Sequence, residues 1–251
     1  MLLEQEIQRI IVEKVTELNR PDLFRSPLVA FSSACDPKYT ELKSIIGPWH
    51  YLPTELLPEA KSVISYFVPF TKEVVCQPKM VTDGSVLWSE AYQEINAYFD
   101  EINYTLASYL KNQGYQTETI RATHTYDPKD MKSRWSHRSA AVIAGLASLG
   151  ANRLAITAKG SGGRFCTVIT SAPLEPNSIP APQRCPYLQN GSCGLCFKAC
   201  PVGALRPDGM DKFACQDEVN KNQEKLRKET NLVNVDTCGK CISVCPFSYI
   251  E

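Results

Sequence analysis

The chain has 251 residues, 43% of them apolar, which is enough to bury one large core or two smaller ones. Lysine and arginine together number 27, as do aspartate and glutamate, so the formal net charge is zero. This balance excludes an overall basic field that would attract nucleic acid, although a local patch remains open. No stretch approaches the ~18 consecutive apolar residues of a membrane span. We therefore expect a soluble globular protein without membrane contact.

The first half of the chain predicts two amphipathic helices with a buried strand between them. Residues 3–18 place apolar side chains at helical spacing among charged ones. Residues 27–60 show no period and contain five prolines, so we interpret them as connecting structure. Residues 62–70 are a β-branched and aromatic run typical of a buried strand. Residues 89–113 repeat apolar side chains every three or four positions, which predicts a long helix.

The next segment predicts a strand, a helix and a hairpin. Residues 116–122 favour a strand. Residues 134–149 favour a helix rich in alanine and glycine, whose small side chains allow close backbone approach. Residues 154–157 and 164–170 predict a strand pair around the glycine-rich turn at 159–163.

A change of composition predicts the domain boundary. Four prolines between residues 171 and 183 favour an extended linker. We therefore expect two domains, an α/β core over residues 1–180 and a smaller domain over residues 181–251. Within the second domain, residues 216–231 are strongly charged and predict an exposed helix.

The second domain holds eight of the eleven cysteines, and six of the eight form two copies of one motif. The copies are Cys193-Gly-Leu-Cys196-Phe-Lys-Ala-Cys200-Pro201 and Cys238-Gly-Lys-Cys241-Ile-Ser-Val-Cys245-Pro246. Each copy has the form Cys-x2-Cys-x3-Cys-Pro. In two-cluster ferredoxins the cysteine before proline ligates the opposite cluster. The motif therefore predicts a dicluster, bacterial-ferredoxin-like domain with two 4Fe-4S clusters.

The crossover rule divides eight thiolates into two sets of four. One cluster takes Cys185, Cys193, Cys196 and Cys245. The other takes Cys200, Cys215, Cys238 and Cys241. Cys185 lies upstream of the usual first ligand position, which is Asn190 here, so it has to reach in around the intervening loop.

Zinc and disulfides are the alternative uses of these cysteines. Zinc ribbons also carry paired Cys-x2-Cys, but they do not require a third cysteine and a proline at the same offset in both copies. Disulfides need an oxidising compartment, and the N-terminal residues lack the basic and apolar regions of a signal peptide. We expect a reducing, cytoplasmic location. Cys35, Cys76 and Cys166 stand alone, and we interpret them as small buried apolar residues.

Over residues 60–250 the order of these features resembles the epoxyqueuosine reductase and reductive dehalogenase family. The resemblance is carried by the strand at 63–66, the segment 136–152, the glycine turn, residues 167–170 and the cysteine module. In that family the corresponding helix ends in Ala-Gly-Leu-Gly-x-x-Gly-x-Asn. The matching residues here are Ala144, Gly145, Leu146, Gly150 and Asn152, with Ala147 in place of one glycine.

The resemblance implies a nitroreductase-like α/β (α+β) core that holds cobalamin, with the iron-sulfur domain delivering electrons to it. A flavin is the alternative core cofactor. A low-potential donor of the ferredoxin or flavodoxin type would supply the electrons. The candidate cofactor-binding residues are Gly145, Gly150, Asn152, Gly160 and Gly162.

The resemblance also implies a proton donor. Epoxyqueuosine reductases use an aspartate in an Asp-x-x-Pro-x-x-Glu-Arg segment. Counting back along this chain, the aspartate position falls on Met131 and the glutamate position on His137, while Arg138 matches. The groups nearby that could serve instead are Tyr126, Asp127, Asp130 and His137.

The tRNA-acting members of the family carry further domains beyond the cluster module, whereas this chain stops five residues after Pro246. Together with the zero net charge, this leads us to expect a small organic molecule, or the corrinoid of another protein, rather than tRNA. The alternative function is an electron-transfer or corrinoid-activating protein without substrate chemistry of its own.

Overall fold

The centre of the fold is strand β2 (Ser62–Pro69), which is buried along its whole length. The computed structural model describes residues 2–121, 126–127, 129–177 and 179–251. Strand β2 pairs antiparallel with β1 (Leu28–Ser33) and with β8 (Gly163–Thr170), and β3 (Thr117–Thr119) completes the order β1-β2-β8-β3. Because helices cover both faces of this sheet, its central strand can be apolar without alternation.

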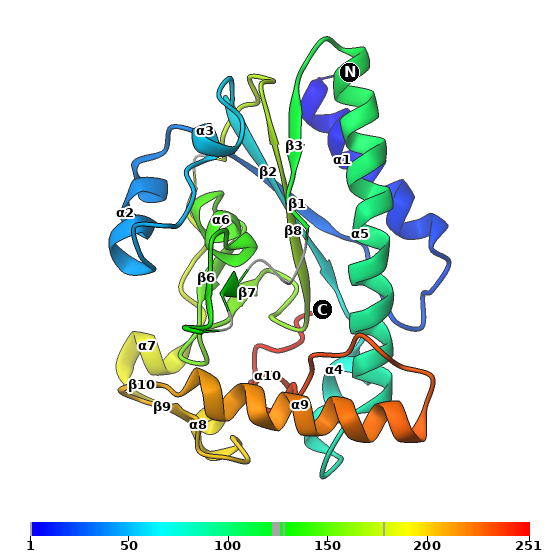
Figure 1. Ribbon diagram of the computed structural model, residues 1–251, viewed down its shortest axis with the longest axis vertical. Coiled ribbons are helices and arrows are strands. Elements are labelled where there is room, and N and C mark those ends of the chain that lie inside the picture. The colour runs from blue at the N-terminus through cyan, green and yellow to red at the C-terminus, as the bar shows by residue number, and fades with distance from the viewer. Residues whose placement is uncertain (1, 122–125, 128, 178) are drawn as a thin grey trace.

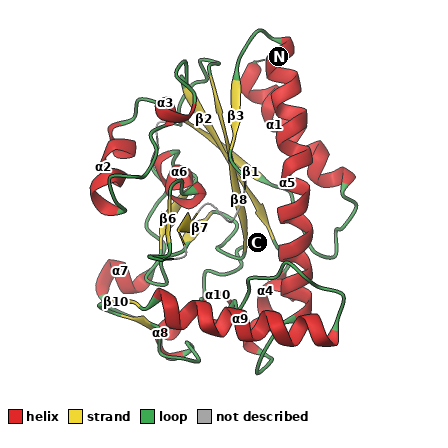
Figure 2. Ribbon diagram, viewed as in Figure 1, coloured by secondary structure: helices red, strands yellow, loops and turns green. Residues whose placement is uncertain are grey.

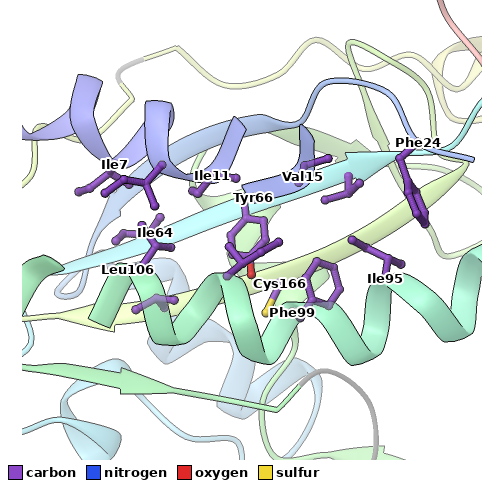
Figure 3. Packing of buried hydrophobic residues seen from close by; sticks show 14 of the residues in the cluster. Ile7, Ile11, Val15, Phe24, Ile64, Tyr66, Ile95, Phe99, Leu106 and Cys166 are labelled. Atoms are coloured by element: carbon purple, nitrogen blue, oxygen red, sulfur yellow. The ribbon is translucent and has the colours of Figure 1, made fainter. Parts of the chain in front are cut away.

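One face of the sheet carries α1 (Leu3–Glu17) and the long helix α5 (Val86–Asn112) (Figure 1). Figure 3 shows Ile64 and Tyr66 of β2 lying between side chains of these two helices. Phe99 of α5 meets the Tyr66 ring edge-on at 5.5 Å. The Tyr66 hydroxyl donates to Asn103 Oδ1 at 2.8 Å, which satisfies the polar group inside this apolar layer.

The other face carries α6 (His137–Ile143) and the hairpin of β6 (Ala147–Leu149) and β7 (Ala155–Thr157). Helices α2 (Pro37–Ile45) and α3 (Pro53–Leu56) flank α6 on the same side, as Figure 2 shows. Phe67 and Phe165 pack here with ring centroids 4.4 Å apart. Ser65 and Thr167, directly paired across β2 and β8, place hydroxyl groups beneath α6.

The remaining elements belong partly to the core and partly to the C-terminal region. In the core these are α4 (Lys72–Cys76), a 3-10 helix (Gln77–Lys79), and the short pair β4 (Tyr126–Asp127) and β5 (Lys132–Ser133). The C-terminal domain contains α7 (Pro186–Asn190), α8 (Leu195–Lys198), β9 (Leu205–Arg206), β10 (Gly209–Met210), α9 (Lys212–Glu229) and α10 (Lys240–Ser243). None of the helices in the described part of the chain combines the length and apolar character needed to cross a bilayer.

Most of the predicted elements are confirmed, and so is the α/β (α+β) class. Predicted segments 3–18, 62–70, 89–113, 154–157, 164–170 and 216–231 appear as α1, β2, α5, β7, β8 and α9. Strand β3 covers the middle of the segment predicted at 116–122, whose last position lies outside the described residues.

Three predictions are wrong. Residues 27–60 are not merely connecting structure, because they form β1, α2 and α3. The helix predicted over 134–149 ends at Ile143, since Gly145 takes φ +70° and turns the chain into β6. Strands β7 and β8 are not a hairpin, because β7 pairs with β6 while β8 pairs with β2 and β3.

Candidate metal centre and the adjoining core

The two cysteine motifs fold in the same way. In each, the residue after the first cysteine is a glycine in the left-handed region, Gly194 at φ +93° and Gly239 at φ +73°. A short helix, α8 or α10, starts directly after that glycine. Glycine accepts this conformation without steric cost. The repeated sequence therefore gives two equivalent turns, each of which carries a pair of cysteines.

The thiols of the first predicted set lie together. Burial raises the pKa of Cys245 to about 11, and the neighbouring thiols of Cys185, Cys196 and Cys193 add to that effect. Burial, and then Cys185 and Cys193, likewise raise the pKa of Cys196. All four cysteines line one recess, whose wall is completed by Gly150, Ala151, Asn152 and Ile156 of the core.

The second predicted set is grouped in the same way. Burial raises the pKa of Cys215 to about 11, and Cys238 and Cys200 raise it further. Burial raises the pKa of Cys241 to about 12, with added effects from Cys238, Cys215, Cys196 and Cys200. Because Cys196 belongs to the first group, the two groups adjoin each other.

This donor set fits a pair of iron-sulfur clusters. Thiols that raise one another's pKa values would repel as thiolates, and a bound polycationic cluster relieves that repulsion. All eleven cysteines are free, so no disulfide competes for them. Within the described ranges, no three His, Cys, Asp or Glu side chains are grouped as ligands of a single metal ion.

The β6–β7 hairpin of the core contacts both cysteine groups. The Ala151 amide donates to Cys185 Sγ at 3.4 Å, and Asn152 Nδ2 donates to the carbonyl of Cys241 at 3.2 Å. Gly150 and Asn152, predicted from the resemblance as cofactor-binding residues, thus lie against the cluster domain. Each of these contacts joins the core directly to a candidate ligand.

The other predicted cofactor-binding glycines lie against the chain's own backbone. A Cβ on Gly160 would approach the Ser248 carbonyl oxygen to 2.4 Å, and one on Gly145 would approach the Ile179 carbonyl oxygen to 2.6 Å. The Gly162 amide donates to the Ser248 carbonyl at 2.8 Å. These three glycines make room for polypeptide, so they do not fit a backbone cradle for cobalamin or flavin.

His137, a predicted catalytic residue, is held beneath α6. Its Nδ1 lies 2.8 Å from Thr167 Oγ1, which also accepts from Trp135 Nε1 at 2.9 Å. Nε2 is buried and lacks a hydrogen-bond partner among the described residues. Burial lowers the pKa of His137 to about 4, against a smaller opposing effect from the backbone of Arg121. The ring is therefore neutral at neutral pH and is a weak candidate for a proton donor.

Arg138 lies on the side of α6 that faces the cluster domain. Its Nη1 donates to the carbonyl of Arg153 at 2.9 Å. Although the Arg138 side chain is exposed at the surface, the protein packed around it and then the nearby Arg164 lower its pKa, while Cys241 opposes that change. The guanidinium is thus close enough to the second cysteine group to interact with it electrostatically.

The remaining catalytic candidates, Tyr126, Asp127 and Asp130, belong to the β4–β5 segment. Asp130 Oδ1 accepts from the amide of Lys132 at 3.0 Å and so closes its own turn. Tyr126 pairs with Ser133 in the register of β4 and β5. Asp130 and Arg138 both influence the pKa of Lys212, whereas no hydrogen bond of Tyr126 with either is found among the described residues.

Lys212 is a site residue that the sequence reasoning missed. Its Nζ donates to the carbonyl of Met131 at 3.0 Å, which ties α9 to the β4–β5 turn. Burial and then Lys132 lower the pKa of Lys212, Asp130 opposes them, and Arg138 adds to the lowering. Lys132, Asp130 and Arg138 are therefore close enough to Lys212 to influence its charge. In the sequence, Lys212 is only one of many charges in a charged helix, so it gives no signal.

The lone cysteines differ in their surroundings. Cys166 is buried and accepts from Asn103 Nδ2 at 3.4 Å, as expected of a small core residue. Cys35 is exposed, so the prediction that it is buried is wrong.

The fold and the cysteine groups define a mixed α/β protein that carries a double-cluster iron-sulfur domain. Residues 189–248 match the family described as the 4Fe-4S double cluster binding domain. The chain is similar to the epoxyqueuosine reductase of Bacillus subtilis strain 168, with 27% identity over 207 residues, 78% of this chain and 50% of the relative. This chain therefore spans about half the length of that curated relative.

Solved structures show the same fold. An epoxyqueuosine reductase with an epoxyqueuosine-modified tRNA stem loop has a TM-score of 0.55 at 19% identity, covering 98% of this chain and 68% of its own. A reductive dehalogenase described in terms of B12-dependent dehalogenation has a TM-score of 0.57 at 15% identity, covering 89% of this chain and 30% of its own. The predicted resemblance to these two groups is confirmed. The expectation that tRNA is not a substrate gains no support, because one of these neighbours was solved with a tRNA stem loop.

Proposed function

We propose that this chain is an iron-sulfur oxidoreductase in which two 4Fe-4S clusters pass low-potential electrons from a donor protein to a reduction in the α/β core. The proposal takes residues 1–180 as the core and residues 181–251 as the cluster domain. The observation that carries it is the grouping of eight thiols into two adjoining sets of four beside the β6–β7 hairpin. One-electron carriers placed side by side and against a second domain are suited to electron delivery.

The reduction would take place where α6 and the β4–β5 turn face α9. Arg138 and Lys212 would hold a negatively charged group there, and Asp130 is the carboxylate near them that could move a proton. Neutral His137 would orient Thr167 rather than supply the proton. A corrinoid, when bound, would supply two-electron chemistry to such a site, but Gly145, Gly160 and Gly162 contact the chain itself and do not form a cradle for it.

Serine substitutions test the crosswise ligation. Anaerobically purified protein should contain about eight iron atoms per chain. Cys245→Ser should remove the same paramagnetic signal as Cys193→Ser, although Cys245 belongs to the second motif. Cys200→Ser should remove the same signal as Cys238→Ser. The control is Cys35→Ser, at an exposed cysteine outside both groups. Crosswise ligation fails if Cys245→Ser instead gives the spectrum of Cys238→Ser.

A second candidate function is electron transfer without substrate chemistry. The observation that favours it is the covering of Gly160 and Gly162 by residues Ser248 and Tyr249, which fills the position expected for a core cofactor. Titration of the iron-loaded protein with hydroxocobalamin separates the two. Binding, followed by reduction of cobalt that depends on the clusters, supports the oxidoreductase. Clusters that reduce an artificial acceptor in a protein that binds no corrinoid support the carrier.

A further inference from the structure

One stretch of the cluster domain has an unusual charge pattern. Between Glu175 and Asp208 the sequence contains no aspartate or glutamate, whereas the chain as a whole has equal numbers of acidic and basic residues. The same stretch contains three basic residues, Arg184, Lys198 and Arg206. A locally basic surface can therefore exist on a protein of zero net charge.

The structure gathers this stretch onto one corner of the molecule. Figure 1 shows α7, α8 and the β9–β10 pair together at one end of α9. Tyr187 of α7 meets Phe197 of α8 edge-on with ring centroids 5.0 Å apart, and α8 also packs on β9. We call the exposed surface of residues 184–206 the basic corner.

Apolar side chains are exposed on the basic corner, and one of them, Leu195, lines the same recess as the candidate ligand Cys193. Leu188, Leu195 and Val202 are exposed by 50%, 45% and 43%. Cys193 is exposed as well, whereas Cys185 is buried and the other six candidate ligands are half-buried. Single exposed apolar residues need no explanation, but three of them within residues 184–206, the stretch that also carries the most accessible candidate ligand, are consistent with an interaction surface.

Two cations of the basic corner, Lys198 and Arg206, are exposed. Within the described ranges, the ion pair found for them joins Arg206 to Asp208 at 3.8 Å. A pair at that distance and exposure neutralises little.

From this arrangement we infer that the basic corner docks a small acidic electron-carrier protein, which passes one electron at a time into the cluster beside Cys193. The carrier is oxidised by one electron and the cluster is reduced by one, so no proton or bond is exchanged. Transient redox complexes bury little surface, and opposite charges accelerate their formation. This inference rests on the proposed function.

The test compares two double charge reversals. Lys198→Glu with Arg206→Glu changes the basic corner. Lys221→Glu with Lys228→Glu makes the same change in charge on α9, where both lysines are about 70% exposed. Each iron-loaded protein is mixed with reduced plant-type ferredoxin, an acidic carrier, and the rate of cluster reduction is followed by stopped flow. Sodium dithionite serves as a small reductant that needs no docking surface.

We expect the corner variant to lose about tenfold in rate at low ionic strength, and the α9 variant to stay within about twofold. Added salt should slow the wild type towards the corner variant, a result that requires no substitution. Dithionite should reduce all three proteins alike. If the corner variant loses iron, the double variant Lys198→Gln with Arg206→Gln is used in its place. Its rate of reduction by ferredoxin should fall by about half as much on a logarithmic scale.

Equal ferredoxin rates in the corner variant and the wild type would overturn the inference, as would a wild-type rate that is independent of salt. A protein reduced by dithionite but not by any acidic carrier would also overturn it, leaving the clusters in place. Absence of iron, or failure of dithionite to reduce the clusters, would instead refute the proposed function.

Discussion

The core buries Phe67, Phe99 and Leu106 almost completely, within apolar clusters that extend over both faces of the sheet. The cluster domain has little of this kind, and one of its apolar groups joins just Leu226, Leu232 and Val235. In the cluster domain, the thiols and the clusters they are proposed to bind take over the stabilising role that apolar side chains have in the core. Small domains that cannot bury enough apolar surface use metal to stabilise the fold. The two regions therefore differ in what holds them together, although they are connected by many hydrogen bonds.

The largest expected effect is that of iron removal. Protein stripped of iron under anaerobic conditions should lose amide protection throughout α9 and residues 185–200, because their packing depends on the clusters. Strands β2 and β8 should keep theirs. Hydrogen exchange read by mass spectrometry measures both. Retained amide protection in α9 would mean that its few buried residues are enough to keep the helix folded without iron.

A substitution in the core should destabilise the core and leave the iron content unchanged. Phe99→Ala removes a ring that is 1% exposed, and we expect the free energy of unfolding of the core to fall by about 3–5 kcal/mol. Iron content per folded protein should stay the same. Tyr104→Ala, on the same helix at 71% exposure, is the matched control and should cost little. Denaturant unfolding provides the measurement, and loss of iron in folded Phe99→Ala protein would argue against independent stabilisation.

A substitution where the two regions meet should have an effect on stability of intermediate size. Gly160→Ala combines a residue at φ +99° with a Cβ placed 2.4 Å from the Ser248 carbonyl oxygen. Gly114→Ala shares a positive φ, +85°, but meets nothing within 4 Å. We expect about 1 kcal/mol for Gly114→Ala and roughly twice that for Gly160→Ala. Exchange at residues 247–250 should rise in Gly160→Ala alone. Equal costs would show that the close approach is easily relaxed.

The smallest expected effect concerns pH. Because burial lowers the pKa of His137 from 6.5 to about 4, the unfolded chain takes up a proton before the folded one as the pH falls. Stability should therefore be unaffected above pH 6.5 and decline between 6.5 and about 4, by about 1 kcal/mol per pH unit. His137→Asn should remove this part of the slope. Urea unfolding at pH 7.5 and 5.5 checks it, and identical slopes would contradict the assignment.

The sequence was most informative where chemistry or burial restricts residue choice over a short distance. The spacing of the cysteines predicted two groups, because a ligand set must converge whatever the surrounding fold. The continuous apolar run of β2 predicted a buried strand for a similar reason. Both features depend on residues close together in the chain.

Features that depend on distant segments could not be predicted. Residues 144–149 contain alanine and leucine and are compatible with a helix, yet the approach of Ile179 to Gly145 and the pairing with β7 make part of them a strand. The proximity of Lys212 to Asp130 and Arg138 arises only when α9 folds against the β4–β5 turn. The prolines of segment 27–60 led to the wrong prediction of connecting structure, because proline also starts helices such as α2 and α3.

The crosswise grouping of the thiols bears on how such a protein is made. Cys193 and Cys196 leave the ribosome well before Cys245, and Cys200 leaves well before Cys238 and Cys241. Under the proposed ligation, a nascent chain that has presented only its first motif can complete neither cluster. Iron loading would then be an all-or-none step that follows translation of both motifs, and a chain truncated between them would retain no partial redox activity.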